Sequence, residues 1–170
     1  MCAAGLHHKL RPLAIIGKNP LLIVLKHIQH VAFATLSRTF VALYSRIPIF
    51  GFLPASVAVI RNGPLLLIVD RNDGRGFSFP GGLASPWESA EEAMRREVCE
   101  ETGLAVEKSS LLFEYRTSAD IPCKLSVFEV EVSGQLRDSW EGSPRWLPAT
   151  AIRSSLLPSQ KEIVDRLLGK

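Results

Sequence analysis

Residues Gly82 to Leu104 read GLASPWESAEEAMRREVCEETGL, and this stretch decides the fold of the chain around it. Three carboxylates, Glu97, Glu100 and Glu101, fall within little more than one helical turn. Like charges at this spacing repel one another, so they are tolerated when a cation lies between them or when water screens them on an exposed face. The stretch therefore predicts either a cation site or a solvated acidic surface.

Local signals predict a helix over residues 86–102. Ser85 fits the N-cap, Pro86 suits the first turn, and Glu88 stands where a capping box needs an acid. Gly103 provides a left-handed stop at the C-terminal end.

One face of this helix is expected to pack on a sheet. Ala90, Met94 and Val98 recur at helical spacing and form an apolar stripe, with Glu97 and Glu101 beside it. We therefore expect the two carboxylates at the edge of a cleft.

The acidic residues of the helix are candidates for binding a hard divalent cation. Arg96 is predicted to pair with Glu92 and Glu100, which leaves Glu97 and Glu101 available to a ligand. Carboxylate oxygens suit Mg²⁺ or Mn²⁺. Glu97 and Glu101, four residues apart, are the best-placed ligands, and Glu100 is next.

The order of residues in this stretch resembles the Nudix box of the Nudix hydrolase superfamily. The matching residues are Gly82, Glu88, Arg96-Glu97-Val98, Glu100-Glu101 and Gly103-Leu104, and Phe79-Pro80-Gly81-Gly82 resembles the usual lead-in. The resemblance implies an enzyme that hydrolyses a pyrophosphate linkage in a nucleoside diphosphate linked to another moiety. It also implies an α/β/α sandwich around a mixed sheet, which agrees with the expected order of strands and helices. The alternative is a surface helix with a run of glutamates.

The resemblance also implies roles for particular residues. By position, it implies four metal ligands: Glu97, Glu100, Glu101 and the backbone carbonyl of Gly82. Arg96 would orient a glutamate, and Glu88 would hold the geometry between the loop and the helix. The general base would be a metal-bound box glutamate acting through water or a carboxylate from a later loop, for which Glu141 is the candidate. An ordinary loop acid is the other interpretation of Glu141.

Length and composition predict one catalytic domain preceded by a basic segment. A chain of 170 residues with 46% apolar content can bury a proper core. Residues 1–69 contain seven Lys or Arg and no acid, whereas residues 70–170 carry a net charge of −4. We expect residues 1–53 to form the basic helical segment and residues 54–170 the Nudix domain. Three cysteines without metal-ligand spacing predict free thiols and a cytoplasmic location, and no stable nucleic-acid partner is expected.

The basic segment is predicted to contain a long helix over residues 19–46, capped by Asn19 and Pro20. Its polar side is narrow and carries Lys26, His27, His30, Ser37 and Arg38. The apolar arc is too wide for an ordinary surface helix, and its charges interrupt it too often for a membrane span. Three interpretations stay open: peripheral contact with an anionic membrane, packing on its own domain or in a homodimer, and a cleaved targeting segment.

The remaining elements are expected on both sides of the box. The expected strands are 55–61 and 65–70, joined by an Asn62-Gly63 hairpin signal, then 77–79, 111–117, 124–132 and a strand end at 146–148. A helix over 159–168 would turn Ile163, Val164, Leu167 and Leu168 inward.

Substrate contacts are predicted outside the box. Arg71 and Arg75 would reach a polyphosphate from the loop 71–76, and the alternative for both is a solvated loop. Four aromatic residues would stack on a base, with burial in the core as the alternative: Phe77, Phe79, Trp87 and Trp140. The compact catalytic part favours a small nucleotide as the diphosphate substrate. Two other functions stay open: a membrane-associated hydrolase of a lipid-linked or other non-nucleotide diphosphate, and a catalytically silent nucleotide-binding module.

Overall fold

The computed structural model describes residues 51–169 and five isolated residues before them, Val31, Thr35, Thr39, Ala42 and Leu43. These five have helical backbone and are exposed, and the rest of the helix predicted over 19–46 lies outside the described residues. The membrane contact, the homodimer and the boundary between residues 53 and 54 therefore stay predictions. Within the described part of the chain, no helix is long and apolar enough to cross a bilayer.

In the described part of the chain, seven strands form one mixed sheet. The strands are β1 (Leu53–Asn62), β2 (Leu65–Arg71), β3 (Phe77–Ser78), β4 (Gly81–Leu83), β5 (Ala105–Thr117), β6 (Cys123–Ser133) and β7 (Gly142–Pro148). Their order is β3-β2-β1-β6-β5, with β4 also paired to β1 and β7 to β2. The β1–β6 pair is parallel and the other pairs are antiparallel.

The predicted strands are present, but two of their ends were predicted wrongly. The first hairpin turns at Gly63 and Pro64 rather than at Asn62-Gly63, because Asn62 pairs with Leu65 and belongs to β1. Gly63 has a φ of 55°, which glycine adopts without strain. Strand β5 begins at Ala105 rather than at residue 111, because the start of this edge strand is mostly exposed and lacks apolar alternation.

Strand β4 was not predicted, because its sequence begins with two glycines, which are uncommon in strands. A Cβ atom on Gly81 would lie 2.2 Å from the carbonyl oxygen of Ser56 in β1. The absence of a side chain therefore allows β4 to lie close against β1. This contact carries the lead-in of the box onto the sheet.

The central helix, α2 (Ala90–Thr102), begins later than predicted. Its N-cap is Ser89, which forms a capping box with Glu92, whereas Ser85 and Glu88 close a separate turn before the helix. Both pairs fit the same sequence pattern, and the pair next to the regular helix is the cap. The predicted stop is confirmed, because Gly103 has a φ of 77° and its N–H donates to the carbonyl of Cys99.

The C-terminal part contains three short helices, α3 (Ala149–Ile152), η1 (Pro158–Gln160) and α4 (Lys161–Leu167). The helix predicted over 159–168 is therefore divided between η1 and α4. Ile163 and Val164 are buried as predicted, but Leu168 is 38% exposed, because it follows the last residue of the helix.

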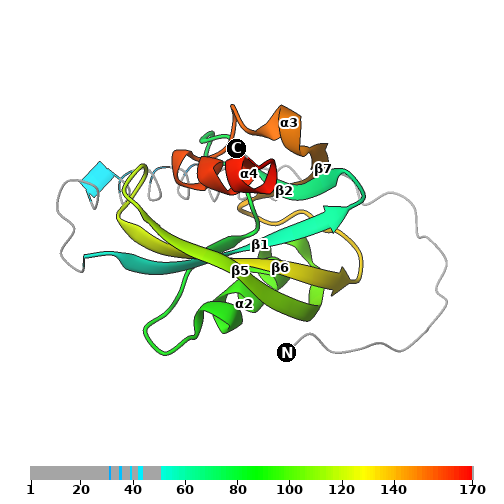
Figure 1. Cartoon of the computed structure of the whole chain (residues 1–170), viewed down its shortest axis with the longest axis horizontal. Helices are drawn as coiled ribbons and strands as arrows, with labels where there is room; N and C mark the ends of the chain where they lie inside the picture. The colour runs from blue at the N-terminus through cyan, green and yellow to red at the C-terminus, as the bar shows by residue number, and fades with distance from the viewer. Residues whose placement is uncertain (1–30, 32–34, 36–38, 40–41, 44–50, 170) are drawn as a thin grey trace.

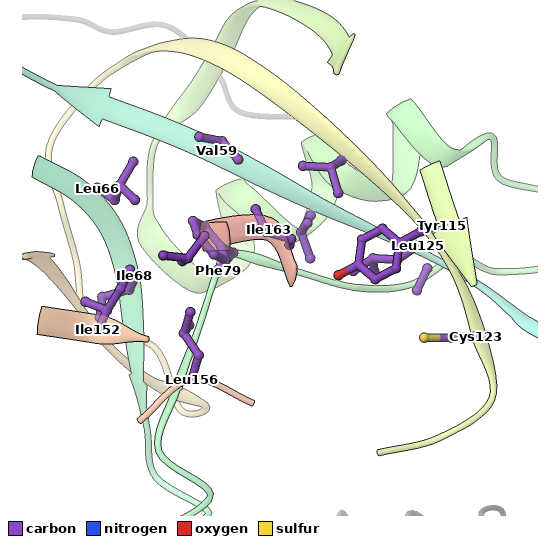
Figure 2. Packing of buried hydrophobic residues seen from close by; sticks show 14 residues of the cluster. Val59, Leu66, Ile68, Phe79, Tyr115, Cys123, Leu125, Ile152, Leu156 and Ile163 are labelled. Atoms are coloured by element: carbon purple, nitrogen blue, oxygen red, sulfur yellow. The ribbon is translucent and has the colours of Figure 1, made fainter. Parts of the chain in front are cut away.

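Helices cover both faces of the sheet, with α2 on one side and α3 and α4 on the other (Figure 1). On the α2 side, the core contains Met94 and Val98 of the helix together with Ala58, Ile60, Leu67, Phe128 and Val130 of the strands. On the opposite side, Ile152 and Ile163 pack with Val59, Ile68 and Leu125 (Figure 2). The predicted α/β/α sandwich with a mixed sheet is confirmed for the described part of the chain.

The cysteines differ from the prediction of free thiols. Cys123 is a free, buried thiol at the start of β6, but Cys99 on α2 is disulfide-bonded. Burial raises the pKa of the Cys123 thiol to about 11, and the charge of Asp120 adds to the rise. Because the thiolate is the reactive form, Cys123 is an inert packing residue at neutral pH.

Candidate active site

The innermost acid of the candidate site is Glu101, in the last turn of α2. This residue is 1% exposed, and its Oε2 accepts a hydrogen bond of 2.9 Å from the N–H of Gly81. Burial raises the pKa of the Glu101 carboxyl to about 8 against the opposing effect of the Gly81 hydrogen bond, and the charges of Glu97 and Glu141 add to the rise. The box helix therefore directs one carboxyl group into the protein, against strand β4.

Glu97 lies one helical turn before Glu101 and faces the same strand. A Cβ atom on Gly82 would lie 2.5 Å from Glu97 Oε1, so the glycine at this position leaves room for the carboxylate. Burial also raises the pKa of Glu97, while the neighbouring Arg96 opposes the rise. The side chain of Glu100 is 59% exposed, so the three box glutamates have different surroundings.

Arg96 connects the carboxylates of the box. Its guanidinium lies 2.8 Å from Glu88, 2.7 Å from Glu97 and 3.2 Å from Glu100. The predicted pair with Glu92 is wrong, because Glu92 bonds to the N-cap serine and Glu88 takes its place. The Arg96 hydrogen bonds are the main cause that lowers the pKa of Glu88 to about 2. Arg96 thus holds the turn before the helix and the helix face together, which is the arrangement expected of an orienting residue.

Glu141 joins the box glutamates from a different part of the chain. It lies in the loop that leads into β7, and its backbone carbonyl accepts a 2.8 Å hydrogen bond from Asn72. Burial raises the pKa of Glu141, and the charge of Glu97 adds to the rise while Arg71 opposes it. Glu141 is therefore within electrostatic range of Glu97. A role of Glu141 in the site stays a prediction, beside its interpretation as an ordinary loop acid.

The donor set fits a hard divalent cation in its chemistry. Glu97, Glu101 and Glu141 provide carboxylate oxygens in a partly dry environment, and their mutual repulsion is relieved when a cation binds. In the described part of the chain, no group of three or more His, Cys, Asp or Glu side chains is already assembled tightly enough to hold a metal ion. Arg96 instead occupies oxygens of Glu97 and Glu100. The metal ligands Gly82, Glu97, Glu100 and Glu101 therefore stay a prediction.

The loop after β2 brings both predicted arginines to one cavity. The side chain of Arg71 is 11% exposed and pairs with the fully buried carboxylate of Asp73. Arg75 lies 3.5 Å from Asp120 of the turn before β6. Both arginines line the same pocket, so neither is a solvated loop tip. The sequence did not predict a role for Asp73. The only signal for such a role is its position two residues from Arg71 and two from Arg75.

This pocket is a cavity of about 130 Å³ between strands β1, β3 and β4 and the C-terminal part of the chain. Gly81 and Gly82, which contact Glu101 and Glu97, also line it, so the cavity and the carboxylates share one wall. Ser56 and Ser78 line it as well. Their hydroxyl groups are buried and have no hydrogen-bond partner in the described part of the chain. Buried hydroxyls of this kind are rare and indicate a missing polar ligand or water.

The predicted stacking residues divide into core and surface. Phe79 is 0% exposed in the core, so a direct contact between its side chain and a substrate is wrong (Figure 2). Phe77 is partly buried against the same core. Trp87 and Trp140 are 86% and 54% exposed and stand in the loops before α2 and β7. Trp140 is next to Glu141, the predicted loop acid of the site, in the sequence.

Comparison with known proteins agrees with this architecture. The model of the NUDIX domain matches residues 51–167, more than half of the chain. YtkD of Bacillus subtilis (strain 168), provisionally named as an 8-oxo-dGTP diphosphatase, is 46% identical over 68 residues, which cover 39% of this chain and 42% of that relative. The chain thus matches less than half of the relative's length.

Solved structures support the fold over a longer stretch. The solution structure of the E. coli ORF135 protein has a TM-score of 0.62 and 18% identity, and the match covers 72% of this chain and 93% of that one. A NUDIX hydrolase from Nitrosomonas europaea has a TM-score of 0.58 and 26% identity, with coverage of 70% and 90%. The resemblance read from the box is therefore confirmed.

Proposed function

The chain belongs to the Nudix family, and on that premise we propose that it hydrolyses a pyrophosphate linkage in a nucleotide or nucleotide derivative, with Mg²⁺ as its cofactor. One observation carries the proposal. The carboxyl groups whose pKa is raised in the described part of the chain are those of Glu97, Glu101 and Glu141, and they gather beside a pocket lined by two arginines. Acids with raised pKa values near a cavity are typical of functional sites.

The residues that would hold the metal are the box glutamates Glu97, Glu100 and Glu101 with the carbonyl of Gly82. When bound, Mg²⁺ supplies neutralisation of the phosphate charge and activation of water. Arg96 would release its hold on the carboxylate oxygens and orient the glutamates from one side. Its three short contacts with the box make it suited to that task.

The proton of the attacking water requires a base near the phosphate. Glu141 is the candidate from outside the box, because its pKa is raised above the ordinary value for a glutamate and its carboxyl lies near Glu97. The alternative is a box glutamate, and Glu101, with a pKa of about 8, would then give up its proton when positive charge is added beside it.

The proposed substrate is a nucleoside triphosphate. The provisional name of the Bacillus subtilis relative points to an oxidised purine nucleotide, and we take that class as the first to test. The small pocket supports a single heterocycle, because its lining combines apolar residues such as Leu157 and Val57 with polar residues such as Arg71 and Arg75.

A substrate panel whose products are separated and identified by liquid chromatography tests this proposal. The full chain is incubated with Mg²⁺ and 8-oxo-dGTP, dGTP, ATP, ADP-ribose, a dinucleotide and a prenyl diphosphate. We expect hydrolysis of at least one nucleoside triphosphate. Glu97→Gln and Glu101→Gln should each lower turnover by about 100-fold or more, because a metal ligand is lost while shape is kept.

Glu91→Gln provides the matched control. Glu91 lies on the same helix, but it is exposed and bonds to Arg95 and Ser109 away from the pocket, so its loss should leave turnover unchanged. Turnover of Glu97→Gln close to that of the control would contradict the metal assignment. Binding of nucleotide without hydrolysis of any compound would favour a silent binding module instead.

A further inference from the structure

Asp73 is a fully buried carboxylate in the turn that follows β2. Its side chain has 0% exposure. Both of its oxygens lie 3.1 Å from Arg71 Nε, and Arg71 Nη2 also donates to Oδ2. Its Oδ1 accepts a further hydrogen bond of 3.0 Å from the backbone N–H of Arg75. One carboxylate thus holds the side chain of one pocket arginine and the backbone of the other.

Arg71 lies beside the candidate active site. Its positive charge opposes the rise in pKa of both Glu101 and Glu141, so it lies within electrostatic range of the acids. Arg71 also lines the pocket beside Gly81 and Gly82. The guanidinium therefore stands where the cavity meets the carboxylates.

The turn after β2 does not need a buried ion pair for its own formation. Asp70, the residue before Arg71, forms an ion pair of 3.1 Å with Arg145, and both of these side chains are exposed. Burying a carboxylate and a guanidinium costs free energy, because both leave water, and such pairs contribute little net stability. What such a pair provides is a fixed orientation, because the carboxylate holds the planar guanidinium in one position.

We propose that Asp73 is a positioning residue that fixes the guanidinium of Arg71 at the junction of pocket and carboxylates, where it binds a non-bridging phosphate oxygen of the substrate. A guanidinium is a planar fork of N–H donors, a geometry that suits phosphate oxygens. The same carboxylate accepts a hydrogen bond from the backbone of Arg75, whose side chain lies 3.5 Å from Asp120 in the lining of the pocket. This inference rests on the proposed function for the identity of the ligand, a nucleoside polyphosphate.

Direct binding of a non-hydrolysable analogue tests the inference without relying on turnover. A nucleoside triphosphate with a methylene group between the β- and γ-phosphorus atoms is titrated calorimetrically into the full chain with Mg²⁺. Asp73→Asn should weaken binding about tenfold or more, because the hydrogen bond from Arg71 to phosphate is no longer held in place. Asp70→Asn, which removes only an exposed ion pair, should bind as the unchanged chain does.

Kinetics separate positioning from a general loss of structure. With a substrate found in the panel, Asp73→Asn should raise KM about tenfold and change kcat by less than about threefold. If Asp73→Asn binds the analogue as tightly as Asp70→Asn does, the inference is wrong. Equal loss of kcat in every variant with unchanged KM would also overturn it. If no panel compound is hydrolysed but the analogue binds, the proposed function fails while the binding comparison still decides the role of Asp73.

Arg71→Lys keeps the test decisive when Asp73→Asn fails to fold. Lysine retains the charge but lacks the fork of donors that Asp73 holds, so we expect a similar loss of affinity. The folded state of each variant is followed by circular dichroism and thermal melting. Unchanged affinity of a folded Arg71→Lys would show that the orientation of the guanidinium is not used. The double variant should be no weaker than the weaker single variant, because both changes remove one interaction.

Discussion

The three box glutamates have different environments although they are close in sequence. Glu100 is largely exposed, whereas its neighbour Glu101 is 1% exposed against strand β4, because successive helical residues point about 100° apart. The sequence predicted Glu97 and Glu101 as the best-placed acids, and both are the more buried ones. Their degree of burial, and hence their raised pKa, depends on strand β4, which the sequence did not predict.

The buried thiol of Cys123, at the start of β6, predicts a loss of stability at alkaline pH. Burial raises the pKa of Cys123 from 9.0 to about 11, so the unfolded chain loses this proton at lower pH than the folded one. The stability contributed by the protonated thiol is fully present below pH 9 and is lost as the pH rises towards 11. The expected loss is about 2 to 3 kcal/mol, measured as the free energy of unfolding by urea at pH 8 and pH 11.

Cys123→Ala isolates the contribution of the thiol. This variant should begin with lower stability because it leaves a small cavity, but its stability should fall less steeply between pH 9 and pH 11. Parallel pH curves for the two proteins would mean that other groups, such as the buried Tyr115, account for the alkaline loss.

At the scale of elements, strands β1 and β3 each contribute to the lining of one cavity a serine whose buried hydroxyl has no partner in the described part of the chain. Ser56→Ala and Ser78→Ala should each leave the free energy of unfolding unchanged or raise it by up to about 1 kcal/mol, because an unsatisfied buried polar atom is removed. The same variants should raise the KM for the substrate of the panel while kcat is kept. Chemical denaturation and steady-state kinetics measure the two effects.

Ser126 on β6 is the matched control for these variants. It is also a buried serine, but its hydroxyl donates a 2.6 Å hydrogen bond to Glu114. Ser126→Ala should therefore lower the free energy of unfolding by about 1 kcal/mol and leave KM unchanged. A loss of stability in Ser56→Ala or Ser78→Ala equal to that of the control would mean that these hydroxyls already have partners in the free protein.

The start of helix α2 shows a limit of predicting the boundaries of an element from the local sequence. Ser85-x-x-Glu88 and Ser89-x-x-Glu92 have the same pattern four residues apart, and the local signal favoured the first because Pro86 follows it. The second is the cap, and Glu88 is used by Arg96 instead. This choice depends on the long-range packing of α2 against β1 and β4, which local propensity does not contain.

At the scale of the whole molecule, the repulsion among buried acids predicts stabilisation by metal. Adding Mg²⁺ at about 100 times its dissociation constant should stabilise the folded chain by about 2.7 kcal/mol, because the ion binds the folded state. For a domain of this size, that corresponds to a rise in Tm of about 5 °C or more, measured by scanning calorimetry with Mg²⁺ and with a chelator.

The double variant Glu97→Gln/Glu101→Gln should melt at the same temperature with and without Mg²⁺. Glu91→Gln should show the same rise in Tm with Mg²⁺ as the unsubstituted chain, because this variant retains Glu97 and Glu101. An equal rise in Tm for the double variant would mean that the ion binds elsewhere on the molecule.

The sequence by itself determined the box helix and its left-handed stop, the order of most strands, the apolar stripe that packs on the sheet, and the family. These features follow from local patterns of charge, glycine and apolar periodicity within a few turns or strands. Only the tertiary structure brought Ser56 and Ser78 into the lining of the cavity, paired Asp73 with Arg71 beside it and coupled Glu141 to Glu97. It also buried Phe79 in the core. Such residues meet through strand pairing across long sequence separations, where the side chains involved leave no periodic signal in the sequence.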